Sequence, residues 1–206
     1  MQPGARAAAS ARAVLALMLL APGMLAQEPP HRADWDTVSA NLLLTLLLRG
    51  YVQPKVEHGG GEIRILIVGN DRFGRAVESL ARGKKASGKN RLLLCPLRVS
   101  GERLDEQRER MRSAHVIVVA TEDEKVERTV LWEASGRPIL LCGREPDFVR
   151  HGGHILLWLS EDGKPAFEIA EKALAELGIG VEAAAVKASR KAPRRTARRA
   201  DEGGGK

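Results

Sequence analysis

Short apolar runs recur along the middle of this chain, and a segment with helical periodicity separates each run from the next. Four such runs lie at residues 63–68, 91–97, 115–120 and 138–143. Strands that are apolar almost throughout, rather than alternating with polar residues, are buried on both faces, and a helix between successive strands favours parallel pairing. We therefore expect an α/β fold that is Rossmann-like, with a mostly parallel sheet flanked by helices.

The segments on either side of these runs complete the expected fold. A Leu-rich segment at residues 34–49 predicts a helix that Asp34 or Asp36 caps, that Gly50 ends, and that is buried on more than one side. Ile155–Leu159 and Ala166–Ile169 flank a tight turn, which predicts a C-terminal antiparallel hairpin. Further helices are expected at residues 72–82, 104–111, 126–132, 171–177 and 181–188, and a loop at 51–61.

The two ends of the chain differ in composition from the middle. Residues 1–26 carry Arg6 and Arg12, then a nine-residue apolar run that is too short for a bilayer core of roughly 20 residues. This pattern predicts a cleavable signal peptide, cleavage near Ala26 and a periplasmic protein. Residues 27–33 form a leader, residues 34–188 the α/β domain, and residues 189–206 a disordered basic tail.

Most of the chain's positive charge lies at its ends. The net charge is +7, from 33 basic and 26 acidic residues. Without the two arginines of residues 1–26, and without the eight basic and two acidic residues of 187–206, the count is 23 basic against 24 acidic. The folded part is therefore near neutral, which excludes specific nucleic-acid binding through a basic surface. The tail is either solvated or in contact with anionic surfaces.

The turn after the first strand is the place where many α/β proteins bind phosphate. Gly69 and Gly74 have the spacing of a P-loop, but Arg75 and Ala76 stand where that loop needs Lys and Ser or Thr. A turn that needs glycine for its backbone explains the segment without a ligand. Nucleotide binding here therefore remains the alternative interpretation.

No other residue pattern predicts chemistry. His151 and His154 are three residues apart, but further metal ligands are not evident, and His115 is expected to be half-buried and hydrogen-bonded. Cys95 and Cys142 are expected to be buried free thiols, with a disulfide as the alternative. Carboxylates in the runs 102–112 and 122–127 are expected to form solvated helix faces. We predict no catalytic residue, no cofactor and no metal.

Several segments, in order and spacing, resemble the YfiR family of periplasmic proteins over residues 37–188. They are Tyr51-Val-Gln-Pro54, Ile65–Gly69 with Phe73-Gly74, Pro138–Gly143, Phe148, Gly152-Gly153 with Ile155, and Phe167-Glu-Ile169. Gln53 and Ala170 depart from the family pattern, which has Trp and Asn there. The family-motif residues, for structure or interaction, are Tyr51, Pro54, Gly69, Phe73, Gly74, Gly152, Gly153 and Phe167.

The resemblance implies a non-catalytic periplasmic regulator. The best-known family members repress a membrane signalling protein, a diguanylate cyclase, through its periplasmic region, and so lower cyclic-di-GMP and biofilm formation, whereas others are sensory modules, so the family does not fix the partner. The family also makes a homodimer plausible. Two other functions stay open from the residues alone: a protein that binds a small ligand or nucleotide, and a structural protein of the cell envelope.

Overall fold

The computed structural model describes residues 32–56, 61–69, 72–86, 93–101, 104–160 and 163–190. The expected signal peptide and most of the leader lie outside these residues, as does the tail beyond residue 190. Within the described residues, no helix combines the length and the hydrophobicity that crossing a bilayer requires.

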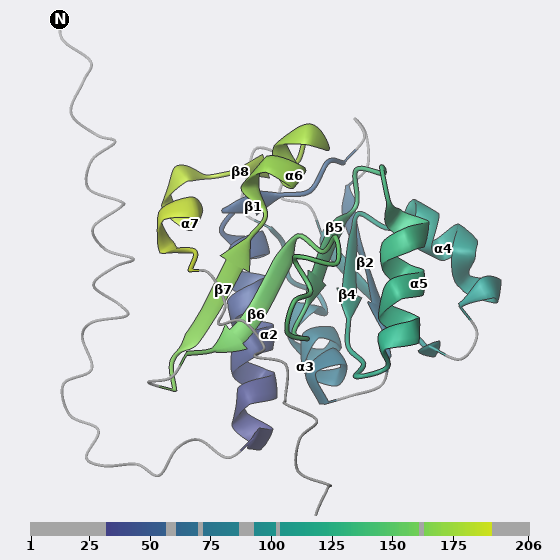
Figure 1. The fold of residues 1–206 in the computed structure, drawn as a ribbon, viewed down its shortest axis with the longest axis horizontal. Coiled ribbons are helices and arrows are strands. Elements are labelled where there is room, and N and C mark those ends of the chain that lie inside the picture. The colour runs from purple at the N-terminus through teal and green to yellow at the C-terminus, as the bar shows by residue number, and fades with distance from the viewer. Residues whose placement is uncertain are drawn as a thin grey trace, which may run out of the picture.

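A six-stranded sheet forms the centre of the molecule (Figure 1). Its strands run in the order β3-β2-β4-β5-β6-β7, and the first five are parallel. The hairpin partner β7 lies antiparallel to β6 at one edge. The strands are β2 Glu62–Val68, β3 Leu93–Val99, β4 Val116–Val119, β5 Leu140–Gly143, β6 Ile155–Leu159 and β7 Pro165–Ile169. The predicted fold class is confirmed.

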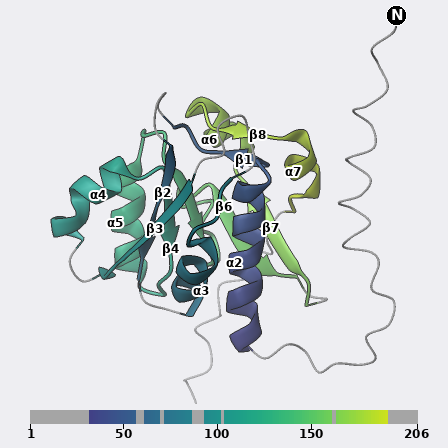
Figure 2. The same ribbon diagram turned by 180° about the vertical axis from the view of Figure 1, so that it is seen from behind.

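Helices cover both faces of this sheet (Figures 1 and 2). On one face, α2 (Arg32–Leu48) and α3 (Arg72–Ala81) pack on Ile65 and Ile67. On the other, the short 3₁₀ helix η2 (Asp105–Gln107), α4 (Arg108–Ser113) and α5 (Glu124–Ala134) lie over Leu66 and Val68. Successive residues of a strand point to opposite faces, so the apolar run of β2 serves two separate cores.

The Leu-rich helix is buried on more than one side, as predicted. Leu43 and Leu47 are both 1% exposed, in the core that α2 shares with α3 and the sheet. Gly50, at a φ of 72°, follows its end. The prediction that Asp34 or Asp36 caps the helix is wrong, because α2 begins at Arg32. Arg and Ala favour helix, so the helix continues toward the N-terminus past both aspartates.

A second, two-stranded sheet joins the two ends of the domain. β1 (Val52–Gln53) pairs antiparallel with β8 (Gly180–Val181), which lies between α6 (Glu171–Glu176) and α7 (Ala183–Ala188). Part of the segment expected as a loop is therefore a strand, and Val181 lies in a strand rather than in the last helix. Beyond α7, Ser189 and Arg190 hydrogen-bond to the outer edge of β7.

Candidate functional site

The family-motif residues do not form one site. Tyr51 and Pro54 are half-buried beside the small sheet, whereas Gly69, Phe73 and Gly74 lie where β2 leads into α3. Gly152 and Gly153 lie in the loop before β6. Phe167 is 7% exposed and lies in the core beneath α2. Gly69, Phe73, Gly74, Gly153 and Phe167 are all buried. Their burial indicates that these residues maintain the fold rather than contact a ligand.

The backbone of the turn after β2 packs tightly against the end of β4, although a cavity of about 730 Å³ lined by Gly69, Thr121 and Asp123 opens at the same edge of the sheet. Gly69 has a φ of +112°, and a Cβ atom built there would lie 2.1 Å from the carbonyl oxygen of Ala120. In doubly wound sheets, ligands bind beyond the carboxyl ends of the two strands where the order reverses, here β2 and β4. The backbone after β4 packs directly on this glycine, which favours the structural interpretation of the turn. Residues 70 and 71 lie outside the described residues.

Phe73, at the start of α3, packs against the guanidinium of Arg144, the residue that follows β5. The guanidinium of Arg144 lies 4.5 Å from the centre of the Phe73 ring. Arg144 also pairs with Asp36 of α2, and both side chains are largely buried. This contact connects α2, α3 and the end of β5, so Phe73 has a structural role in the described part of the chain.

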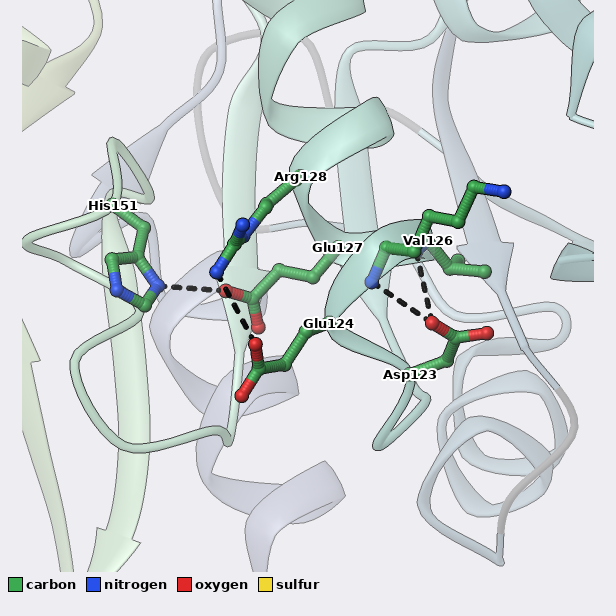
Figure 3. Close-up of polar contacts among 7 residues, drawn as sticks. Asp123, Glu124, Val126, Glu127, Arg128 and His151 are labelled. Carbon is green, nitrogen blue, oxygen red and sulfur yellow. Dashed lines mark hydrogen bonds and ion pairs between the residues drawn. The ribbon is translucent and has the colours of Figure 1, made fainter.

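A buried carboxylate joins α5 to the loop before β6, as Figure 3 shows. Glu127 is only 4% exposed, and its Oε1 lies 3.0 Å from Nδ1 of His151. The expectation that the run 122–127 is a solvated face is therefore wrong at this residue. Glu127 begins the buried stripe of α5, which continues through Val130 and Leu131, and the half-exposed imidazole covers it.

The imidazole ring of His154 makes a structural hydrogen bond inside the fold. It is buried, and its Nδ1 accepts a hydrogen bond of 3.1 Å from the backbone N–H of Leu141. Burial lowers the pKa of His154, and a hydrogen bond to the backbone of Ile139 partly offsets this. Among the described residues, no three His, Cys, Asp or Glu side chains are placed to hold a metal ion. His115 is half-buried and accepts a hydrogen bond from Arg64, as expected.

His154 predicts a pH dependence of stability. The folded state disfavours the imidazolium, so below pH about 6.5 the unfolded chain binds more protons and the free energy of unfolding falls. We expect a decrease of up to about 1.4 kcal/mol per pH unit in that range. Urea unfolding from pH 5 to 8 measures it. His154→Asn, which keeps an acceptor for Leu141, should reduce the slope, and an unchanged slope would contradict the assignment.

The two cysteines are free and lie on different strands, with β2 and β4 between them. Cys142 is fully buried, and burial raises its pKa far above the usual range of a thiol. Cys95 is only partly buried, which departs from the expected burial; desolvation, followed by the nearby Glu62, raises its pKa. A raised pKa suppresses the thiolate, so neither group is an activated nucleophile.

One residue that the sequence analysis did not single out is the most exposed large hydrophobic side chain described. Trp132 of α5 is 73% exposed. It lies between two open grooves of about 500 and 490 Å³, one toward Arg108 and Lys125, the other toward His151 and Leu177. The sequence does contain a signal for this exposure, because Trp132 lies off the buried stripe of the amphipathic helix α5. We call the residues Arg108, Lys125, Arg128, Thr129, Trp132 and His151 the Trp132 surface.

The local sequence explains how α5 presents this surface. Asp123 caps the helix by accepting hydrogen bonds from the backbone N–H groups of Lys125 and Val126 (Figure 3). Glu133, which is also buried, pairs with Arg108 at 3.1 Å and so fixes α5 against α4. The exposed side of a firmly held helix therefore carries the tryptophan.

Comparisons with known proteins identify a family. A family model described as YfiR/HmsC-like matches residues 39–190, which is more than half of the chain. No curated protein matches the chain.

Two solved structures are similar at low identity. One is the ABC domain in complex with L-Trp from Streptococcus pneumonia, at 13% identity and a TM-score of 0.48, covering 74% of this chain and 59% of that one. The other is a conserved domain protein from Vibrio cholerae O1 biovar El Tor, at 14% identity and a TM-score of 0.48, covering 74% and 58%. The chain spans less than two thirds of the length of each.

Proposed function

The chain belongs to the YfiR/HmsC-like family, and we propose that it is a non-catalytic periplasmic regulator that represses a membrane signalling protein. The proposed partner is a protein such as a diguanylate cyclase, bound through its periplasmic region, so that the regulator lowers cyclic-di-GMP and biofilm formation. The family supports the regulatory class, and the residue pattern of a signal peptide at residues 1–26 supports the periplasm.

The proposed partner-binding surface rests on one observation, the exposure of Trp132. An indole that is 73% exposed gains from burial against another protein, and tryptophan and arginine are the residue types most enriched in binding hot spots. The grooves on its two sides offer space for a partner's side chains. We therefore place the partner on the Trp132 surface.

Charge around Trp132 favours a partner with an apolar anchor and some acidic residues. Arg108 is half-exposed and Arg128 is 73% exposed, and each pairs with a glutamate on α5. Lys125 adds a further cation along the same groove. The pair of Arg128 with Glu124 is exposed on both sides, so it contributes little to stability, and its energy changes little when a partner's carboxylate replaces water around Arg128.

Trp132→Ala is the test of this surface. Removing a hot-spot tryptophan typically costs at least about 2 kcal/mol of binding, which weakens affinity roughly 30-fold. We expect the variant to lose co-isolation of its membrane partner after in-cell cross-linking and to raise cyclic-di-GMP to the level of a deletion strain. The fold should be retained, because a substitution at a mostly exposed position changes stability by only about 0.5 kcal/mol.

Leu159→Ala provides the matched control. Leu159 is also an exposed apolar residue, at 39%, but it lies at the end of β6 rather than on α5. Its variant should cross-link and repress normally. Normal repression by Trp132→Ala, or equal losses in the two variants, would exclude the Trp132 surface. No change in cyclic-di-GMP on deletion of the whole protein would exclude the proposed partner class.

A further inference from the structure

A cavity lies at the amino-terminal edge of the parallel sheet, opposite the edge where α/β proteins usually bind ligands. Its volume is about 810 Å³, and it is bordered by the starts of β2 and β3 and by the segments before β4 and β5. Small-molecule sites have volumes of roughly 300–1,000 Å³, so this space is large enough for a metabolite.

The side chains that line this cavity are unusually basic for a near-neutral domain. Lys55, Arg64, Arg112 and Arg137 border it, and Glu62 is the carboxylate among the described lining residues. Glu62 lies beside Cys95 of β3 and contributes to the raised pKa of that thiol. Since residues 27–186 carry 23 basic and 24 acidic residues, the excess of cations here is local and is not a reflection of overall composition.

Two of the arginines are held in place by helix carbonyls. Nε of Arg64 donates to the carbonyl oxygen of Ser113 at 2.6 Å, at the end of α4. Nε of Arg137 donates to the carbonyl oxygen of Glu133 at 3.2 Å, near the end of α5. Satisfying helix C-terminal carbonyls is an ordinary role for arginine. Among the described residues these two contacts use only Nε, so the Nη1 and Nη2 amino groups of both guanidiniums remain for a ligand.

Within the described part of the chain, Arg64 and Arg137 bind backbone carbonyls rather than carboxylates. Arg112 approaches Glu133 only at 3.9 Å, whereas Arg108 pairs with the same carboxylate at 3.1 Å. Contacts with backbone carbonyls orient Arg64 and Arg137 and, because these carbonyls lie at or near helix C-termini, compensate their charge only in part. An anion bound in the cavity is attracted to both guanidinium groups.

We propose that this cavity binds a small polyvalent oxyanion, a molecule with two or more phosphate or carboxylate groups. Guanidinium groups bind both kinds of oxyanion through paired hydrogen bonds, and anchoring each arginine through Nε lowers the entropy cost of ordering it. Two arginines held against the ends of different helices, with a lysine and a third arginine lining the same cavity, suit a ligand with more than one charged group. The proposal does not depend on the Trp132 surface.

Isothermal titration calorimetry with pyrophosphate and with citrate tests the proposal and distinguishes the two sources of charge. We expect one of them to bind saturably, at one molecule per chain, in buffer whose ionic strength is matched with NaCl. Arg64→Gln and Arg137→Gln should each weaken this binding at least about tenfold. Arg82→Gln is the matched control, because Arg82 is an exposed arginine of the turn after α3 that pairs with Glu78. Its variant should bind normally.

Each outcome is decisive. Tighter binding of pyrophosphate assigns the site to phosphate compounds, and tighter binding of citrate assigns it to polycarboxylates. Heat that does not saturate, or that NaCl alone reproduces, would overturn the proposal. Undiminished binding in both the Arg64→Gln and Arg137→Gln variants would overturn it too, and circular dichroism confirms that each variant is folded.

Discussion

Replacing Gly69 by alanine is expected to destabilise the protein by at least about 3 kcal/mol. The new Cβ would lie 2.1 Å from the carbonyl oxygen of Ala120 and 2.7 Å from its carbonyl carbon, and both are backbone atoms. Ala120 also donates its N–H to Val68 at 2.8 Å, so moving it disturbs the pairing of β4 with β2. The φ of +112° adds backbone strain of about 1–3 kcal/mol for any residue with a side chain. Urea unfolding monitored by circular dichroism measures the loss.

Gly83→Ala separates the close contact from the backbone strain. Gly83 also has a positive φ, of +71°, but a Cβ there would meet nothing within 4 Å. Its variant should lose only about 1 kcal/mol, the cost of the left-handed conformation. Similar losses in the two variants would show that contact with Ala120 does not matter.

The six strands were predictable because burial on both faces leaves a clear sequence pattern. The runs that became β2, β4 and β5 are apolar at nearly every residue, and their separation by helices implied parallel pairing. The C-terminal hairpin was predictable from its turn residues. Its register pairs Leu157 with Phe167, as two strands with a short connection require.

The small sheet was not predictable from local sequence. β1 and β8 have two residues each and are separated by nearly the whole domain. Two residues carry no periodicity, so only the folded arrangement reveals the pairing of Val52 with Val181. Short segments of this kind adopt the structure that their neighbours impose.

The candidate surfaces depend on contacts between distant segments, and such contacts are not visible in sequence. Glu127 looks like one more charge in a solvated helix until His151, from a loop 24 residues later, covers it. Arg64 and Arg137 lie far apart in the chain, and only the parallel sheet brings the starts of β2 and β5 to the same edge. Trp132 was not predicted either, although its place off the apolar stripe of its helix is a local pattern that could have indicated its exposure.

The loop before β6 predicts a second large effect, centred on Phe148. This ring is fully buried, and Gly143 and Gly153 both lie against it. Phe148→Ala should cost about 3–5 kcal/mol, the usual range for a buried phenylalanine that leaves a cavity. Gly153→Ala should cost about 1–3 kcal/mol, because its Cβ would lie 2.2 Å from two carbon atoms of the ring.

Combining the two substitutions tests whether the glycine is required by the ring. Once Phe148 is alanine, the atoms that oppose a Cβ at Gly153 are gone, and the added methyl group fills part of the cavity. The double variant should therefore be more stable than the sum of the single losses predicts, by at least about 1 kcal/mol. Gly152→Ala is the control, because a Cβ at Gly152 meets nothing within 4 Å, so its loss should add to that of Phe148→Ala. Additive losses for Gly153 as well would mean that this glycine is needed for a reason other than the ring, and contact with a ligand or partner would then be the first alternative to examine.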